Sequence, residues 1–380
     1  MCDKEEVKFG DICREVKLTT KDPITDGYER YVGLEHMDSG SLKLKRWGII
    51  SEDKPSFTRV FRKGNILFGK RRPYLKKAAI ADFDGVCSGD IIVIEPSQKL
   101  SVPEVLPFIV QSEEFWQWAI KTSSGSLSPR TKFKSLAEFS LKISNDQEKL
   151  KSASTILNHT VANIALKEDL IHQSELLMQV LIIEKLFKGT PGKYRKLGDI
   201  SRIIDPNPSH RYPESVKNGV PLLSTENFDG IDGFSLEDCK NVDEGIYEEQ
   251  ENRCQYSEYD IVFARKGRIG FSRFYGKGKK CFSHTIALIK PDPKIVLPEY
   301  LLWTLRSTKT IRNIENRMNS NSGVPTLGLK HLSEVEIPVL HFSDQIELVK
   351  SLNALNNIRS QAQSSKAYSN DIVKEITRRL

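Results

Sequence analysis

The sequence runs Phe9-Gly10-Asp11-Ile12-Cys13-Arg14 near its start and Leu197-Gly198-Asp199-Ile200-Ser201-Arg202 at an offset of 188 residues. A second pair of matching stretches, Asn65-Ile66-Leu67-Phe68-Gly69-Lys70 and Asp260-Ile261-Val262-Phe263-Ala264-Arg265, has an offset of 195 residues. Loop insertions produce such a drift, because surface loops tolerate changes of length at low entropic cost. The second half of the chain therefore repeats the first.

Each repeat combines strand and helix patterns. Short apolar runs at residues 66–68, 78–81 and 91–94 stand between Gly, Pro and Asp and predict strands. Residues 103–121 begin with proline and carry apolar side chains on roughly one face, which predicts a helix. Residues 139–143 predict a closing strand, which the second repeat matches. We therefore expect an α+β fold in which each repeat is a mixed α/β domain.

A helical pattern follows each domain. Residues 146–188 and residues 344–380 place apolar side chains at three- and four-residue steps. Roughly 40 helical residues span about 60 Å, too far to bury such a stripe inside one domain, so we expect the two helices to pack on each other as an antiparallel coiled coil. The two domains would then be related by a pseudo-twofold axis. The expected segments are 1–145, 146–189, 190–342 and 343–380.

Composition indicates a globular chain. Of the 380 residues, 38% are hydrophobic and 28% charged, and the net charge of +7 is compatible with a polyanionic partner without proving one. The first residues carry acids and lysines where a secretory signal needs an apolar core, and no stretch approaches about 20 apolar residues. We expect a cytoplasmic protein with no membrane contact. The six cysteines form no CxxC pair, so buried free thiols are the simplest interpretation.

Motifs for catalysis are missing from the sequence. It contains no GxxxxGK[ST] loop, no HExxH and no Asn- or Asp-Pro-Pro-aromatic motif, and Gly276-Lys277-Gly278 alone is too weak to indicate a nucleotide site. Asp90, Glu95 and Lys99 resemble a nuclease set only loosely, because their spacing is wrong and the second repeat lacks both acids. We expect no catalytic residues, no metal and no cofactor bound by this chain.

Two clusters of cations recur at equivalent positions after the same predicted strand. A solvated hairpin face is the alternative for one such cluster, but recurrence without neighbouring acids favours phosphate neutralisation and, through arginine, recognition of guanine edges. The first cluster holds Lys70, Arg71, Arg72, Tyr74, Lys76 and Lys77. The second holds Arg265, Lys266, Arg268, Arg273, Lys277, Lys279 and Lys280.

A polar loop before the closing strand is a second candidate surface. Residues 123–132 include Ser126, Arg130 and Lys132, and the counterpart at residues 319–323 includes Asn321. Such side chains bond phosphates or base edges, and they are equally ordinary in loops that bind nothing.

The whole arrangement resembles the specificity subunits of Type I restriction-modification systems. The stretch Gly69-Lys70-Arg71-Arg72-Pro73-Tyr74-Leu75-Lys76-Lys77 is similar to one typical of that family, as are Leu197-Gly198-Asp199-Ile200 and the Asp-Gln pairs that open both helices. The second repeat departs from the pattern, because Gly267-Arg268-Ile269-Gly270 stands where the first has Arg-Pro-Tyr-Leu. The departure suggests that the two domains read different half-sites.

The resemblance implies a non-catalytic, DNA-binding subunit with two target recognition domains, each of which reads one half of a bipartite asymmetric target in double-stranded DNA. It implies that the helices set the gap and dock the modification (methyltransferase) subunits, expected to be two. Those subunits would bind S-adenosylmethionine, and restriction subunits would join through the complex. Two alternatives stay open: a detached recognition region of a Type II restriction-modification enzyme, and a coiled-coil protein-interaction adaptor.

Overall fold

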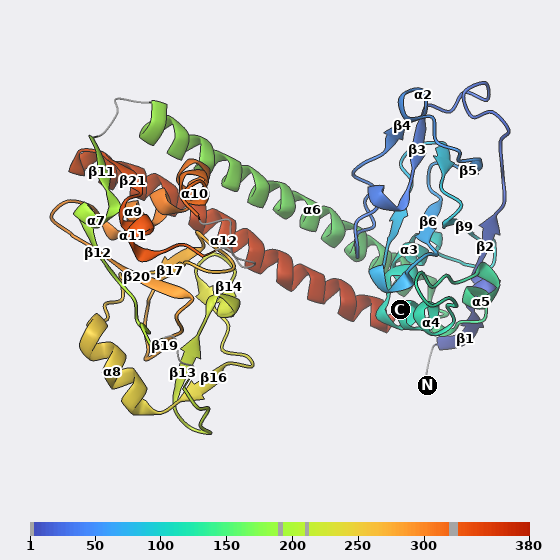
Figure 1. Ribbon diagram of the computed structural model, residues 1–380. Coiled ribbons are helices and arrows are strands. Elements are labelled where there is room, and N and C mark those ends of the chain that lie inside the picture. The colour runs from blue at the N-terminus through green and yellow to red at the C-terminus, as the bar shows by residue number, and fades with distance from the viewer. Residues whose placement is uncertain (1–3, 189–192, 210–212, 319–325) are drawn as a thin grey trace. The chain divides into compact units, whose positions relative to one another are not determined.

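The computed structural model describes residues 4–188, 193–209, 213–318 and 326–380 (Figure 1). The chain splits into two compact units. Unit 1 comprises Met1–Lys167 and Ser364–Leu380, and unit 2 comprises Glu168–Gln363. The boundaries fall inside the two long helices, because the end segments of each helix pack on different cores.

The described residues of unit 1 form two four-stranded sheets and a two-stranded one. The first is antiparallel and has the order β2 (Cys13–Val16), β9 (Ile91–Pro96), β6 (Ile66–Gly69), β7 (Ala78–Ile80). The second has the order β4 (Gly48–Ile49), β3 (Arg30–Val32), β8 (Gly85–Cys87), β5 (Arg59–Phe61), with β3 and β8 parallel. The predicted closing strand is β10 (Ser140–Ser144), which pairs with β1 (Lys4–Lys8).

Unit 2 repeats this plan. Its antiparallel sheet has the order β12 (Ser201–Ile204), β20 (Ile286–Pro291), β17 (Ile261–Ala264), β18 (Ser272–Phe274), and β11 (Lys193–Lys196) pairs with β21 (Glu336–Val339). Its second sheet is β16 (Lys240–Val242), β13 (Val220–Leu223), β19 (Cys281–Phe282). After β16 unit 2 has α8 (Glu244–Cys254), where unit 1 has the shorter α2 (Ile50–Asp53) after β4, and the hairpin of β14 (Phe228–Asp229) and β15 (Gly233–Phe234) is an addition.

Equivalent backbone hydrogen bonds relate the two units. Phe9 N donates to Phe139 O in unit 1, and Leu197 N donates to Val335 O in unit 2, both at 2.8 Å. These bonds hold α1 (Phe9–Ile12) and α7 (Leu197–Ile200) beside the start of the closing strand. The internal repeat read from the sequence is thus a repeat of local structure.

The helix predicted over residues 103–121 is broken, which corrects that expectation. A short turn (Pro103–Val105) leads into α3 (Leu106–Gln111), and α4 (Glu113–Lys121) starts afresh. Ser112 causes the break, because its extended backbone (φ −65°, ψ 150°) lets Oγ accept a hydrogen bond from Phe115 N and cap α4. In unit 2 the same region is α9 (Pro298–Leu305) and α10 (Thr308–Glu315), with Ser307 as the cap.

The long helices are α6 (Gln147–Ile183), followed by a wider turn over Glu184–Lys188, and α12 (Phe342–Arg379). Within unit 1 their segments run antiparallel: Ser144 N, just before α6, donates to Leu380 O, and Lys167 Nζ donates to Ser365 O. Within unit 2, Lys185 pairs with Glu347 at 3.9 Å while Glu175 faces Arg359. Mixed α/β content and a long helix are therefore confirmed, and the coiled coil joining two domains about a pseudo-twofold axis stays a prediction.

The turn after β6 differs from its counterpart by one residue. Seven residues separate Gly69 N from its acceptor Lys77 O, and six separate Ala264 N from its acceptor Phe271 O. Both turns contain two left-handed positions, which Arg72 (φ 53°) and Lys76 (φ 48°) occupy in unit 1. Gly267 (φ 75°) and Gly270 (φ 89°) occupy them in unit 2. The missing Arg-Pro-Tyr-Leu stretch therefore reflects a shorter turn of related geometry.

Across the residues that the structure describes, no helix is both long and apolar enough to pass through a membrane.

Candidate nucleic-acid interface

The first cationic cluster and the polar loop form one surface in unit 1. Arg72 N donates to Pro129 O at 2.7 Å, and Thr131 N donates to Lys70 O at 3.0 Å. Arg71 and Arg130 form an antiparallel backbone bridge between these two bonds. The two candidate surfaces, which the sequence presented separately, therefore lie side by side at the end of β6.

Asp90 binds both arginines at this surface. Arg130 Nε lies 2.8 Å from Asp90 Oδ1, and its Nη2 lies 3.3 Å from Oδ2. Arg71 Nη1 lies 3.6 Å from the same Oδ2, and Arg71 Nη2 donates to Ser128 Oγ at 3.2 Å. The hydrogen bond from Arg130 is the main cause that lowers the pKa of Asp90, so this carboxylate is charged at neutral pH.

The expectation that these cations have no acids to pair with is therefore wrong. Asp90 comes from the start of β9, which pairs with β6 in the register Gly69↔Ile91, and Glu113 Oε2 accepts from Lys76 Nζ at 2.5 Å. Sequence reasoning missed the part that Asp90 and Ser128 play at this surface. Pairing the two predicted strands would have placed Asp90 beside Lys70, whereas nothing in the sequence indicated Ser128.

The remaining members of the first cluster differ in exposure. Lys77 is half-buried and its Nζ donates to Leu34 O at 2.7 Å, so it supports the fold. Lys70 is half-buried as well. The exposed members are Arg72 and Tyr74, and Ser126, Arg130 and Lys132 of the polar loop are exposed as well. Half of the Tyr74 side-chain surface is open to solvent, with 50% relative exposure.

Three of the seven cations in the second cluster are buried. Arg265 Nη2 pairs with Asp205 Oδ2 at 2.7 Å. Arg273 is 1% exposed, its guanidinium lies 3.9 Å from the ring centre of Phe228, and burial lowers the pKa of this group to about 10. Lys280 Nζ donates to the carbonyl oxygens of Tyr275, Lys277 and Gly278 at 2.7–2.9 Å, and burial lowers its pKa to about 8. These side chains face the interior of unit 2.

The other members of the second cluster reach the surface of unit 2. Arg268, Lys277 and Lys279 are exposed and Lys266 is half-buried. Arg268 Nη1 donates to Phe228 O at 3.2 Å, and Lys279 Nζ pairs with Glu244 of α8. Asn321 lies outside the described residues. The cationic surface of unit 2 is therefore smaller than the sequence predicted.

The backbone frame of the two surfaces is nevertheless the same. Leu327 N donates to Arg265 O at 2.8 Å, as Thr131 N does to Lys70 O, and Lys266 forms a backbone bridge with Thr326. Arg265 N donates to Thr285 O, as Lys70 N does to Asp90 O. Thr285 therefore occupies the place of Asp90, and the acid that holds the cation comes from a different loop, at Asp205.

The loosely nuclease-like set does not come together. Asp90 and Glu95 lie at opposite ends of β9, Glu95 pairs with Arg14 at 2.5 Å, and Lys99 Nζ lies 3.8 Å from Asp11. Among the described residues no three His, Cys, Asp or Glu side chains gather as a metal site. The described cysteines, Cys13, Cys87, Cys239, Cys254 and Cys281, are free thiols.

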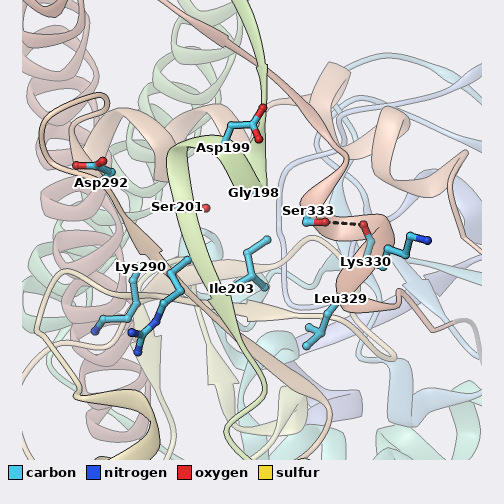
Figure 2. A pocket seen from close by; sticks show the side chains of 10 residues that line it. Gly198, Asp199, Ser201, Ile203, Lys290, Asp292, Leu329, Lys330 and Ser333 are labelled. Carbon is cyan, nitrogen blue, oxygen red and sulfur yellow. Dashed lines mark hydrogen bonds between the residues drawn. The ribbon is translucent and has the colours of Figure 1, made fainter.

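A pocket of about 890 Å³ lies in unit 2 between α7, α11 (Leu329–Ser333) and the edge of the β12–β20 sheet. Figure 2 shows the residues that line it. Its lining includes Asp199, Arg202, Lys290 and Lys330. Lys290 is already paired, because its Nζ lies 2.5 Å from Asp260 Oδ2. The pocket lies at the opposite end of β20 from Arg265, so it is separate from the cationic surface.

These features define a class of protein: two copies of one mixed α/β unit, each with a cationic turn framed by a loop, and long helices that contribute segments to both cores. Residues 192–367 match the family described as the Type I restriction modification DNA specificity domain. Over 125 residues the chain is 29% identical to the specificity subunit of the Type I restriction enzyme EcoDI of Escherichia coli. That alignment covers 33% of this chain and 28% of the curated relative, so the chain matches less than a third of the relative's length.

Solved structures share the fold. The specificity subunit of a Type I restriction-modification system from M. genitalium superposes with a TM-score of 0.66 at 14% identity, covering 99% of this chain and 95% of that one. A chain from a structure on complex assembly and conformational transition of the type I R-M system superposes with a TM-score of 0.53 at 20% identity. The superposition covers 98% of this chain and 96% of that one. The resemblance to Type I specificity subunits is therefore confirmed, with residues 192–367 matching the model of the specificity-domain family.

Proposed function

We propose that this chain is the sequence-specific DNA-binding subunit of a Type I restriction-modification complex, in which each unit reads one half of a bipartite asymmetric target. The observation that carries the proposal is the recurrence of one surface: a cationic turn bridged to a second loop at Lys70–Thr131 and again at Arg265–Leu327. Duplication of a surface inside one chain suits a ligand that offers two separated stretches of the same chemistry, as a DNA duplex does.

The charge of the surfaces supports this role. Exposed cations such as Arg72 and Arg268 neutralise phosphates and release counterions, which supplies affinity without sequence preference. Base preference then requires side chains held in fixed positions at the groove. Two half-sites multiply discrimination, because each mismatched base pair costs about 1–3 kcal/mol and well-separated positions add.

The two half-sites differ in this proposal, because the two surfaces differ in chemistry. Asp90 of unit 1 is replaced by Thr285 in unit 2, and the turn of unit 2 is one residue shorter. The target is therefore asymmetric.

The long helices fix the gap between the half-sites and dock the modification subunits, two per chain. Apolar side chains on α6 support docking: Leu170, Leu177 and Val180 of unit 2 are 46%, 52% and 45% exposed. The modification subunits bind S-adenosylmethionine and transfer its methyl group, while restriction subunits join through the complex. This chain supplies recognition without chemistry or a cofactor of its own.

Methylation mapping tests the proposal. The chain is expressed with a methyltransferase subunit of the same kind of system in cells that lack other such systems, and methylated bases are mapped genome-wide. We expect one bipartite motif with a fixed gap. Replacing residues 190–340 with the equivalent domain of a relative should change one half of the motif and leave the other. A motif without a gap, or a change in both halves, would contradict the modular assignment.

A further inference from the structure

Asp90 positions two guanidinium groups at the surface of unit 1. Arg130 uses its Nε and one Nη2 hydrogen on the two carboxylate oxygens, at 2.8 and 3.3 Å. Arg71 approaches the same carboxylate to 3.6 Å and is also bonded to Ser128 Oγ. The Asp90 side chain is 22% exposed, against 40% for Arg71 and 47% for Arg130, so the carboxylate is the most buried of the three charged groups.

Arg130 has an unused edge. A guanidinium carries five N–H donors in a planar fork, and the contact with Asp90 occupies the Nε side. The side chain of Arg130 is 47% exposed, so its outer N–H groups reach solvent. Two neighbouring N–H groups held in one plane match the O6 and N7 acceptors that guanine presents in the major groove.

We propose that Arg130 is a specificity-determining residue that reads a guanine in the half-site of unit 1, with Asp90 as its positioning residue. This inference rests on the proposed function and names the base that one side chain reads. A contact with a phosphate depends less on a fixed plane of the fork, because a phosphate is also bound by lysine acting as a point charge. Clamping by a carboxylate removes part of the positive charge and in return fixes the plane of the fork.

Unit 2 lacks this arrangement at the equivalent place. Thr326 forms the backbone bridge that Arg130 forms in unit 1, and Thr285 stands in the position of Asp90. Neither side chain offers a fork of charged donors. The guanine preference therefore belongs to one half of the target only.

The test is selection of DNA from a randomised duplex library by the full-length chain in complex with its methyltransferase subunits. We compare the wild type with Arg130→Ala, Arg130→Lys and Asp90→Asn, and use Lys63→Ala as the matched control. Lys63 is an exposed cation of unit 1 at the opposite end of β6.

Arg130→Ala and Arg130→Lys should each reduce the preference for guanine at one position of one half-site about tenfold or more, while all other positions keep theirs. Asp90→Asn should weaken the same position to a smaller degree, because the fork stays but loses its orientation. Lys63→Ala should leave every preference unchanged. Thermal unfolding of each variant checks folding. If Arg130→Ala does not fold, the test rests on Arg130→Lys, which keeps the positive charge.

Two results would overturn the inference while the proposed function stands. One is a uniform loss of affinity for all sequences with a shallower salt dependence, which identifies Arg130 as a phosphate contact. The other is an unchanged guanine preference in Arg130→Lys. Failure of the wild type to enrich any bipartite motif would instead refute the proposed function itself.

Discussion

Arg265 Nη2 lies 2.7 Å from Asp205 Oδ2, and both side chains are withdrawn from solvent, with exposures of 8% and 14%. Arg265 matches Lys70, whereas in unit 1 the acid Asp90 pairs with the neighbouring Arg71 and with Arg130. Both units therefore have a carboxylate near the cationic turn, but Asp90 and Asp205 come from different places in the repeat.

Asp205→Ala should destabilise unit 2, because it leaves the Arg265 charge buried without a partner. Removing one member of a buried pair costs about 3–5 kcal/mol, and we expect about 3 kcal/mol in the free energy of unfolding from urea titration. Glu334→Ala is the control, since its pair with Lys196 is exposed (57% and 46%) and should cost less than about 1 kcal/mol. Equal effects of the two variants would show that the Asp205 pair is not buried in solution.

Substitutions of Arg273 and Lys277, two cations of the second cluster, should have different effects: the first on stability and the second on DNA binding. Arg273 Nη1 donates to Asp229 O at 3.0 Å and also to Gly233 O, which holds the β14–β15 hairpin. Arg273→Met should lower the free energy of unfolding by about 2–4 kcal/mol, because these carbonyls lose a charged donor. Lys277→Ala should leave stability unchanged and reduce the salt slope of DNA binding by about one.

Salt titration of DNA binding and urea unfolding measure the two effects. A reduced salt slope in folded Arg273→Met would contradict its structural assignment.

Acidic pH should weaken the contribution of Asp90 to the stability of the folded chain. The hydrogen bond from Arg130 lowers the pKa of this carboxyl in the folded state, so the folded chain binds fewer protons than the unfolded chain in the acidic range. The stability gained from Asp90 is complete above the unfolded pKa, about 4, and is lost as the pH falls through the folded value. The stability difference between wild type and Asp90→Asn should therefore be constant from pH 7 to 5 and shrink below about pH 4. A difference that grows in acid would have the wrong sign.

The repeat and the long helices could be predicted because they depend on local patterns. Strand β6, for example, covers the predicted residues 66–68, and matching stretches at similar offsets indicate duplication whatever the fold. The break at Ser112 was missed because apolar periodicity continues through it, and only the capping hydrogen bond to Phe115 N shows where one helix stops.

The chemistry of the interface was harder to predict for a different reason. Charge in sequence does not indicate exposure: Arg273 and Lys280 satisfy carbonyl groups inside unit 2, whereas Lys277 between them is exposed. Ion pairs such as Arg130–Asp90 join residues 40 positions apart. Their geometry follows from strand register and loop packing, which local patterns do not contain.

The left-handed turn positions should respond in opposite directions in the two units. Arg72→Gly should stabilise unit 1 by about 0.5–1 kcal/mol, because glycine removes the cost of the left-handed backbone at this exposed residue. Gly270→Ala should destabilise unit 2 by about 1–2 kcal/mol, since the added Cβ would also lie 3.4 Å from Ile311 Cγ1. Thermal unfolding followed by circular dichroism measures both changes. A stabilised Gly270→Ala variant would argue against the left-handed turn.

The gap in the DNA target should grow when the helices grow. In the proposed function the segments around Lys167 and Ser365, which are bonded within unit 1, belong to a spacer between the half-sites. Inserting seven residues into α6 after residue 168 and seven into α12 after residue 363 adds about 10 Å of helix while preserving the heptad register. That length equals about three base pairs of DNA at 3.4 Å each, so the mapped methylation motif should keep both halves and gain about three base pairs of gap. In the control, the seven residues that follow each insertion point are substituted by the inserted sequence, so the helices keep their length. This variant should leave the gap unchanged. An unaltered gap in the lengthened chain would mean that flexible linkers or the modification subunits set the distance.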